Sequence, residues 1–378
     1  MKQRVFGKLG ITGSAMGVGC MRFPMKNVDG KNVVDQEIAN QLVHTAIEGG
    51  VNYFDTAYVY SDRQNEAALG RALAGGWRER VMIATKLPVG YCNTVEDMER
   101  IFGEQLAALQ TDYIDFYLVH ALNRGGWDKM KGLGVREFLD RLKAEGKIRY
   151  ACFSFHDGYD AFEYILNDYD WDMCQLQFNF MDTENQAGLK GVELAGEKGI
   201  PVVVMEGLLG GKLASAPDNV QALYDAFPVK RTPAAWAYRW VANFPQVAVV
   251  LSGVSDMAQL EENLKIFDDA APGCMSEEEL SLIGSVRKAY ESRTKIGCTG
   301  CRYCMPCPGN VDIPGVFRAW NSAFQYSSDV KGSWGYAHLI REGHDASKCL
   351  KCRRCEKLCP QQLSIVDALK TADEEMRG

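Results

Sequence analysis

The sequence has no apolar run approaching the ~20 residues that a membrane-spanning helix needs. The N-terminal segment, MKQRVFGKLGITG, has no apolar signal-peptide core, so we expect a cytoplasmic protein. Basic residues are not in excess, and the formal net charge of −7 argues against nucleic acid or a membrane surface as a partner. No G-x-G-x-x-G motif follows the first strand-like segment, which argues against a Rossmann fold. The 378 residues are enough for one large core and a small appended domain.

Cysteine is abundant and unevenly distributed. Eight of the 13 cysteines lie between residues 298 and 359, and the others are scattered singly: Cys20, Cys92, Cys152, Cys174 and Cys274. Because disulfide frameworks are uncommon in long cytoplasmic chains, the clustered thiols indicate metal or redox chemistry. The scattered five are most simply interpreted as small buried apolar residues.

The first 270 residues alternate between strand-like and helix-like segments. Apolar runs such as VNYFDTA, RVMIATKL and PVVVMEGLL are separated by amphipathic stretches. One of these opens at Thr94 with Asp97 three residues on, close to a capping box, and another ends at Gly146, which suits a helix C-cap. Such repeats predict parallel strands with right-handed crossovers. About eight units in about 255 residues favour an α/β fold of the (β/α)8 TIM barrel type over an open doubly wound sheet.

Four polar residues cluster at the ends of the second, third and fourth predicted strands. Asp55, Lys86 and His120 end these strands, and Tyr60 follows Asp55 by five residues in FDTAYVY. A lone aspartate is usually a turn former and a lone lysine a surface residue. The chemistry of a (β/α)8 barrel lies where its strands end, so four converging polar groups predict a catalytic site.

This set resembles the catalytic residues of the aldo-keto reductase family. The likeness covers roughly residues 5 to 267 and is carried by NYFDTAYVY, ATKL, DFYLVHAL, ACFSFHD and LEENL. It implies reduction of an aldehyde or ketone to an alcohol, or the reverse. By this likeness Tyr60 is the general acid, Asp55 and Lys86 tune it, and His120 orients the carbonyl.

Acid–base chemistry supports those roles. A free tyrosine has a pKa near 10 and donates its proton reluctantly at neutral pH. A nearby Lys86 ammonium favours the phenolate and is expected to lower the pKa of Tyr60, and a buried Asp55 keeps the lysine charged. A neutral His120 can hold the substrate oxygen without competing as an acid.

The resemblance also implies a nicotinamide nucleotide, NADP or NAD, across the barrel mouth. Its carboxamide is expected near Ser154 and Gln175; beside that serine, where the family usually has Asn, this chain has Phe155. Met205 stands where an aromatic commonly stacks on the nicotinamide, and sulfur is a plausible substitute. LLGGKL offers Gly-rich backbone and a cation for the pyrophosphate, although a Gly-Gly pair alone is more often a turn. The candidates in these segments are Cys20, Met21, Ser154, Gln175, Met205, Leu208, Gly210 and Lys212.

The adenosine end of the nucleotide is expected at SGVSDMAQLEENL. Gly253 and Ser255 lead into a helix whose N-terminus favours a phosphate. Gln259 and Asn263, one helical turn apart, are candidates for adenine contact or else part of a solvated helix face. No Lys or Arg lies in this loop to bind a 2′-phosphate, so NADPH and NADH both stay open.

The C-terminal segment contains two runs of four cysteines, each followed by proline. They are Cys298, Cys301, Cys304 and Cys307, then Cys349, Cys352, Cys355 and Cys359. The second run has the C-x2-C-x2-C-x3-C-P spacing of a [4Fe–4S] site, and the first closes with one residue fewer. The alternative is zinc, which usually takes thiolates in pairs ten or more residues apart. The segment therefore resembles a two-cluster ferredoxin.

That resemblance implies how the ligands divide, because in such ferredoxins the fourth cysteine of each run ligates the other cluster. One cluster takes Cys298, Cys301, Cys304 and Cys359, and the other takes Cys307, Cys349, Cys352 and Cys355. Residues 308–348 are too many for a compact ferredoxin linker and indicate helices. The predicted organisation is a barrel over 1–270, a linking helix over 271–296 and an α-helical cluster domain over 297–378.

Three functions stay open at this point. The enzyme could exchange electrons through its clusters with a redox partner protein, or the clusters could only stabilise an ordinary reductase. Alternatively, the barrel could be a nucleotide-binding redox sensor without turnover. The complete set of four catalytic residues argues against the sensor, because nucleotide binding alone does not require Tyr60.

Overall fold

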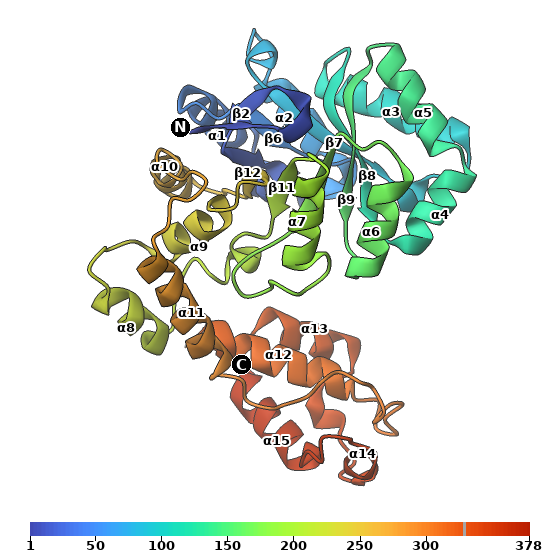
Figure 1. Ribbon diagram of the computed structural model, residues 1–378. Coiled ribbons are helices and arrows are strands. Elements are labelled where there is room, and N and C mark those ends of the chain that lie inside the picture. The colour runs from blue at the N-terminus through green and yellow to red at the C-terminus, as the bar shows by residue number, and fades with distance from the viewer. Residues whose placement is uncertain (328–329) are drawn as a thin grey trace. The chain divides into compact units, whose positions relative to one another are not determined.

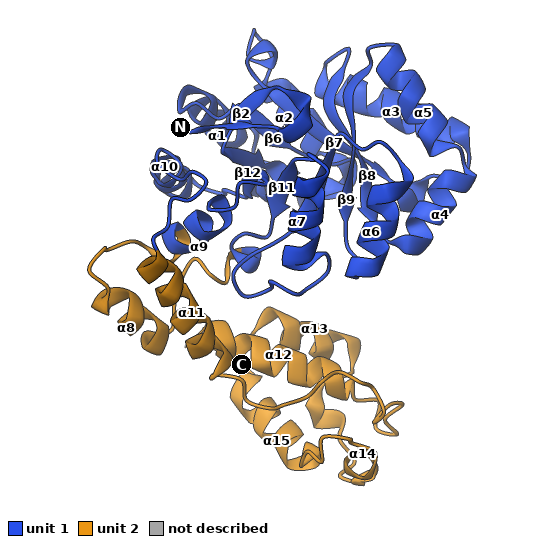
Figure 2. Ribbon diagram, in the orientation of Figure 1, with its two compact units in different colours: residues 1–210, 235–276 blue, residues 211–234, 277–378 orange. Residues whose placement is uncertain are grey.

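The computed structural model describes residues 1–327 and 330–378 (Figure 1). They form two compact units that are interleaved in sequence. Residues 1–210 and 235–276 make the first unit, and residues 211–234 and 277–378 make the second (Figure 2). The second unit thus takes residues 211–234 from between two parts of the first. The predicted domain boundaries at 270 and 296 stay a proposal. In the described residues, no helix is both long enough and apolar enough to cross a membrane.

Eight parallel strands of the first unit close into a barrel. In barrel order they are β3 (Met16–Gly19), β6 (Tyr53–Asp55), β7 (Met82–Pro88), β8 (Ile114–Leu122), β9 (Ile148–Phe155), β10 (Met173–Gln177), β11 (Val202–Met205) and β12 (Val247–Ser252). Each strand lies beside its neighbour in the sequence, as successive right-handed strand–helix–strand crossovers require. The predicted (β/α)8 fold is confirmed.

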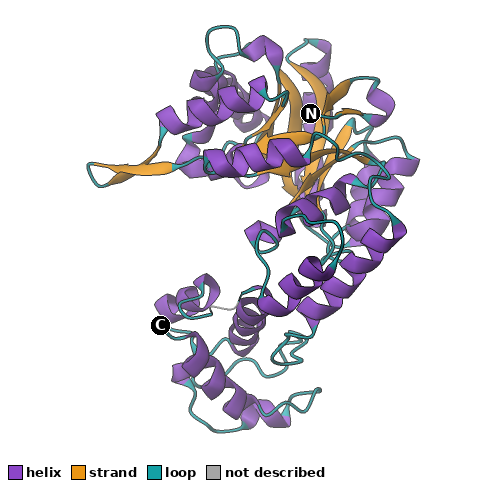
Figure 3. Ribbon diagram, turned by 90° about the vertical axis from the view of Figure 1, so that its left-hand side faces the viewer, coloured by secondary structure: helices purple, strands orange, loops and turns teal. Residues whose placement is uncertain are grey.

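Helices connect the strands and pack around the barrel (Figure 3). They are α1 (Gln36–Glu48), α2 (Asn65–Ala72), α3 (Val95–Leu109), α4 (Arg124–Gly132), α5 (Val135–Ala144), α6 (Tyr159–Asp168), α7 (Gly188–Glu197), α9 (Pro233–Ala242) and, after the last strand, α10 (Met257–Ile266). At the start of α3, the Thr94 hydroxyl accepts the Asp97 N–H and the Asp97 carboxylate accepts the Thr94 N–H, both at 3.3 Å. The predicted capping box is therefore confirmed. After α5, Gly146 has a φ of 69°, the left-handed conformation that favours glycine.

Two antiparallel hairpins lie outside the barrel sheet: β1 (Gln3–Val5) with β2 (Thr12–Ser14), and β4 (Met25–Val28) with β5 (Lys31–Val34). Phe6, just after β1, is fully buried. Its ring centroid lies 5.5 Å from that of Phe116 and 6.2 Å from that of Tyr53. Since these two residues stand near the starts of their strands, the first hairpin closes the N-terminal end of the barrel.

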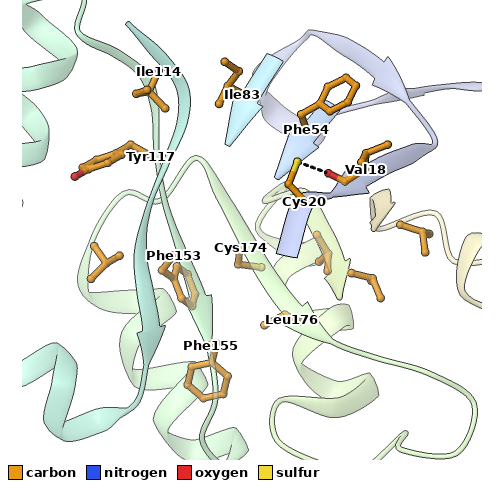
Figure 4. Close-up of a cluster of buried hydrophobic side chains, with 14 of the residues drawn as sticks. Val18, Cys20, Phe54, Ile83, Ile114, Tyr117, Phe153, Phe155, Cys174 and Leu176 are labelled. Atoms are coloured by element: carbon orange, nitrogen blue, oxygen red, sulfur yellow. Dashed lines mark hydrogen bonds between the residues drawn. The ribbon is translucent and has the colours of Figure 1, made fainter. Parts of the chain in front are cut away.

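The two-residue repeat of the strands separates inward from outward side chains. In β8, Phe116 and Leu118 belong to the cluster inside the barrel, whereas Tyr117 and Val119 belong to the larger cluster beneath the helices. Figure 4 shows part of this outward cluster. Five strands also carry an inward residue of the inner cluster: Tyr53, Ala84, Leu118, Cys152 and Met173. Two positions further along each strand, the repeat places a polar residue on the same side, at the C-terminal end of the barrel. These polar residues are, in the same order, Asp55, Lys86, His120, Ser154 and Gln175.

The described residues of the second unit form helices and turns, with no strand. The helices are α8 (Asp218–Ala226), α11 (Glu277–Glu291), α12 (Ile313–Tyr326), α13 (Trp334–Glu342), α14 (Arg354–Lys357) and α15 (Ile365–Met376). Phe317 and Trp320 of α12 pack with Tyr336 of α13 and Leu369 of α15 in a separate apolar core. The predicted helical character of the C-terminal domain is confirmed.

Candidate active site and cysteine sets

A buried ion pair lies at the centre of the candidate active site. The Lys86 ammonium donates to Asp55 Oδ1 at 2.5 Å and to the Thr56 carbonyl at 2.7 Å. Its third contact is the Tyr60 hydroxyl oxygen at 3.4 Å. Gln175 Nε2 donates to the second carboxylate oxygen of Asp55 at 2.8 Å. Lys86 and Asp55 are 1% and 3% exposed, so the pair is hydrogen-bonded inside the protein on both sides.

Tyr60 and His120 lie beside this ion pair and are partly buried. Their ring centroids are 6.0 Å apart with the planes at 79°, an edge-to-face contact. Lys86 Nζ lies 5.0 Å from the centroid of the Tyr60 ring. The structure thus brings the four predicted catalytic residues together, and Tyr60 and His120 are the two that reach the surface.

The turn that follows Tyr60 is strained and held in place. Residues 61–63 have φ values between 48° and 68°, the left-handed region that residues other than glycine rarely adopt. Asn65 is fully buried beneath this turn. It accepts the Thr56 hydroxyl at 3.0 Å and donates to the Cys20 carbonyl at 2.9 Å. Asn65 therefore fixes the segment that carries Tyr60, a role that sequence reasoning missed.

Burial sets the protonation of the site. Burial raises the pKa of Tyr60, and although the Lys86 ammonium acts in the opposite direction, the pKa stays above its ordinary value. The predicted lowering is wrong in net direction, because desolvation outweighs the neighbouring charge. Burial alone would lower the pKa of Lys86, but Asp55 and Tyr60 raise it, so the ammonium form is retained. Burial, followed by the charge of Lys86, lowers the pKa of His120 to about 3, so the imidazole is neutral as predicted.

Asp55→Asn should destabilise the fold. It leaves the Lys86 ammonium buried without its counter-charge, and removing one partner of a buried pair costs about 3–5 kcal/mol in the free energy of unfolding. Adding Lys86→Met removes the unpaired charge, so the double variant should be more stable than Asp55→Asn alone. Urea unfolding of the wild type, Asp55→Asn, Lys86→Met and the double variant measures the coupling free energy between the two residues. Strictly additive losses would show that the two residues do not interact.

The low pKa of His120 should make stability depend on pH. In the unfolded chain this imidazole binds a proton below its ordinary pKa of 6.5, whereas in the folded protein it stays neutral down to about 3. The unfolded state therefore binds more protons between these values, and the free energy of unfolding falls as the pH is lowered through them. His120→Asn should flatten this part of the curve in urea unfolding. An NMR titration in which His120 protonates near its ordinary pKa would refute the assignment.

A second buried polar network holds β7 from its outer side. Gln105 Nε2 donates to the Lys86 carbonyl at 3.0 Å, to the Thr85 hydroxyl at 3.1 Å and to the Glu66 carboxylate at 2.7 Å. The Tyr117 hydroxyl donates to Gln105 Oε1 at 2.8 Å. Glu66 and Gln105 are 4% and 0% exposed, and burial raises the pKa of Glu66. This network fixes the backbone at Lys86, and sequence reasoning did not find it.

The predicted nicotinamide contacts fall on both sides of the sheet. The strand repeat places Ser154, Gln175 and Met205 on the inward side. Cys20 is instead fully buried among the outward side chains, where its thiol donates to the Val18 carbonyl at 3.8 Å (Figure 4). The Cys20 thiol is therefore packed within the core, and contact of this residue with the nucleotide stays a prediction. Met21, the next residue, is 53% exposed.

The predicted pyrophosphate segment is divided between the two units. Leu208 and Gly210 belong to the first unit, where the Gly210 carbonyl accepts from Arg22 at 3.0 Å. Lys212 belongs to the second unit and donates to a serine of α12 at 2.9 Å. Arg22 also lies against Gly253, since a Cβ on that glycine would come within 2.9 Å of the arginine side chain. Arg22, which sequence reasoning missed, is thus an exposed cation between the two glycine-containing loops of the first unit.

Part of the segment predicted to bind adenosine forms hydrogen bonds within the protein. The Ser255 N–H donates to Gln259 Oε1 at 3.0 Å, and both residues are exposed. Asp256 caps α10 by accepting the Gln259 N–H at 2.9 Å, so a carboxylate stands at the helix end that was expected to favour a phosphate. Asn263 is 6% exposed and donates to the Ser252 hydroxyl at 2.8 Å. It joins α10 to β12 and is not part of a solvated face, and its contact with adenine stays a prediction.

The eight clustered cysteines of the second unit surround two hollows. Cys298, Cys301, Cys304 and Cys359 line one, together with Phe317 and Ile365. Cys307, Cys349, Cys352 and Cys355 line the other, which Cys304 also borders. The two runs meet at Gly309, where a Cβ would come within 2.5 Å of the Lys348 carbonyl. Among the residues that the structure describes, no three His, Cys, Asp or Glu side chains are grouped to hold a single metal ion. Each set thus encloses a space and draws one cysteine from the other run.

Comparison with known proteins assigns the chain to a family. A model of the aldo/keto reductase family matches residues 15–272, more than half of the 378 residues. The chain belongs to the aldo/keto reductase family. A 4Fe-4S dicluster domain model matches residues 297–364, so the family barrel is followed by a dicluster domain.

Individual relatives agree with this assignment. An aldo-keto reductase of Mycolicibacterium vanbaalenii is 31% identical over 237 residues, which cover 61% of this chain and 78% of the relative. L-galactose dehydrogenase of Arabidopsis thaliana is 26% identical over 313 residues, covering 77% of this chain and 96% of the relative. The solved structure of an aldo-keto reductase of Bacillus halodurans in its holo form is 26% identical to this chain. The match has a TM-score of 0.63 and covers 76% of this chain and 96% of the Bacillus chain. An aldo/keto reductase of Klebsiella pneumoniae in complex with NADP and acetate, 21% identical with a TM-score of 0.61, shares the fold over 76% of this chain and 96% of its own. The protein is an oxidoreductase of the aldo/keto reductase family.

Proposed function

We propose that the protein uses a nicotinamide nucleotide, NADP or NAD, to reduce an aldehyde or ketone to an alcohol, or catalyses the reverse reaction. The observation that carries this proposal is the Tyr60 hydroxyl, 3.4 Å from the Lys86 ammonium. That ammonium is itself held by the buried Asp55 carboxylate at 2.5 Å. A proton donor backed by a fixed positive charge is what a carbonyl oxygen needs as it gains negative charge.

The residues of the first unit fit a nicotinamide nucleotide. Ser154 and Gln175 present a hydroxyl and an amide on the inward side, groups that can hydrogen-bond a carboxamide. Arg22, bonded to the Gly210 carbonyl and packed against Gly253, offers a cation beside open backbone for phosphate. When bound, the nicotinamide exchanges a hydride with the carbonyl carbon of the substrate.

Tyr60 moves the proton in either direction. In reduction, its hydroxyl donates to the substrate oxygen, and the Lys86 ammonium stabilises the phenolate left behind. In alcohol oxidation, the same phenolate takes the proton back. Asp55 keeps the lysine charged and oriented throughout. His120, neutral because of its low pKa, donates a hydrogen bond that holds the substrate oxygen beside Tyr60.

The cysteine sets of the second unit fit two [4Fe–4S] clusters. Each set offers four thiols around a hollow, and thiolates are the ligands that such clusters take. A structural zinc ion, by contrast, usually takes thiolates in pairs separated by ten or more residues, unlike these two compact runs. We therefore favour iron–sulfur clusters ligated by Cys298, Cys301, Cys304 and Cys359, and by Cys307, Cys349, Cys352 and Cys355.

Anaerobically purified protein tests the proposed reaction. Mixed with NADPH or NADH and a panel of aldehydes, it should oxidise the nicotinamide, which is followed by near-ultraviolet absorbance. Lys86→Met should lose most of this activity, whereas Lys190→Met, a matched change at an exposed position of α7, should keep it. A protein that binds nucleotide but turns over neither carbonyls nor alcohols would be the sensor, and the proposal would fall.

A further inference from the structure

The segment around the second cysteine set presents an exposed basic surface. Its exposed cations, which we call the basic face, are Lys348, Lys351, Arg353, Arg354 and Lys357. The one acid among residues 348–358, Glu356, has a side chain only 18% exposed and accepts the N–H of Val366 at 3.0 Å. The basic face thus concentrates positive charge on a chain whose formal net charge is −7.

Within the part of the chain that the structure describes, most of these charges have no ion-pair partner. Arg353 lies 3.6 Å from Glu356, but among the described residues the other four cations form no ion pair. Arg353 and Arg354 line the hollow and so face the negative charge of a bound cluster. Lys351 and Lys357 do not line it and are exposed, so their charge is available to a partner outside the chain.

The cysteine set reaches the surface within the sequence segment that carries the basic face. Cys352 lines the hollow and is exposed. In the same segment, Leu350 and Leu358 are 64% and 46% exposed. Exposed apolar side chains among charged ones are the composition of a transient protein–protein contact, in which charge steers the encounter.

We propose that the basic face is the docking surface for a small acidic protein that carries single electrons. The proposal rests on the proposed iron–sulfur cluster at Cys307, Cys349, Cys352 and Cys355. An acidic surface around the carrier's redox centre would complement Lys351 and Lys357 and bring that centre next to Cys352. In one encounter the carrier loses one electron and the cluster gains it, or the reverse. This selects the redox-partner function among the three that the sequence left open.

Binding of a purified acidic [4Fe–4S] ferredoxin to the full-length, cluster-loaded protein tests the proposal. The variant Lys351→Glu/Lys357→Glu should weaken the affinity, measured by calorimetry at low salt, by roughly tenfold or more. Arg318→Glu/Lys370→Glu makes the same change in net charge at exposed positions of α12 and α15 and should change it less than about twofold. Added salt should weaken the wild-type complex. Iron content should be the same in all three proteins.

Several outcomes would overturn the docking surface. They are no binding of the ferredoxin, an equal loss in the two charge-reversed variants, or equal binding of a basic c-type cytochrome. A single-stranded oligonucleotide that binds with the same dependence on Lys351 and Lys357 would make the face a general polyanion site. Nicotinamide turnover and iron content, measured on the same samples, separate the causes. Full iron and turnover without ferredoxin binding remove the docking surface alone, whereas missing iron removes the cluster on which it rests.

Discussion

Tyr60→Phe should lower kcat for aldehyde reduction by about 10²–10⁴ while leaving nucleotide affinity nearly unchanged. The hydroxyl is needed mainly in the transition state, when the substrate oxygen takes the proton, so its loss affects turnover more than binding. Phenylalanine keeps the ring that lies 6.0 Å from His120, edge to face, so the packing of the site is retained. Steady-state kinetics and a fluorescence titration with the nucleotide measure the two quantities.

Tyr58→Phe is the matched control. Tyr58 is buried two residues earlier, and its hydroxyl donates to Glu104 at 2.7 Å. Its removal should cost about 1 kcal/mol in the free energy of unfolding, with kcat unchanged. Full turnover in Tyr60→Phe, or an equal loss of kcat in both variants, would refute Tyr60 as the general acid.

Iron content should respond to pairs of cysteine substitutions in a way that identifies which thiols share a cluster. Wild-type protein purified without oxygen should contain about eight irons per chain with matching acid-labile sulfide, and Cys359→Ala about four. Adding Cys298→Ala should cause little further loss, because both thiols line the same hollow. Adding Cys349→Ala should remove the remaining iron, because that thiol lines the other. Iron and sulfide analysis with paramagnetic resonance of the reduced proteins measures this.

The opposite pattern would show that each run of cysteines binds its own cluster. In that case Cys349→Ala would add nothing to Cys359→Ala, and Cys298→Ala would remove the rest of the iron. Stoichiometric zinc without iron in the wild-type protein would refute the iron–sulfur proposal altogether. Circular dichroism of each variant separates cluster loss from unfolding of the helical unit.

The positions of Asp55, Lys86 and His120 could be predicted because local rules determine them. A strand's two-residue repeat and the loop at its carboxyl end can be recognised in the sequence, and a barrel gathers all such ends at one rim. The cysteine spacing is local in the same sense. Long-range features are different: the sequence did not indicate that residues 211–234, with Lys212, belong to the second unit.

What could not be predicted depends on burial. Asn65 and Gln105 occur in helical segments, where polar residues are mostly exposed, and only the fold shows that both are fully buried. The burial of Asn263, which bonds to Ser252, could not be predicted for the same reason. The pKa of Tyr60 was predicted in the wrong direction because the sequence shows the charge of Lys86 but not the larger effect of removing the phenol from solvent.

The central claim, that the barrel exchanges a hydride directly between a nicotinamide and a carbonyl, is tested most directly with a labelled cofactor. NADPH or NADH, whichever the protein oxidises, is deuterated at both C4 positions and incubated anaerobically with an aldehyde and the wild-type protein. Mass spectrometry should find one deuterium on the alcohol carbon for each nucleotide oxidised, whether or not the cluster absorbance changes. Alcohol formed without deuterium would contradict the account, because the electrons would then have reached the substrate by a route other than hydride transfer.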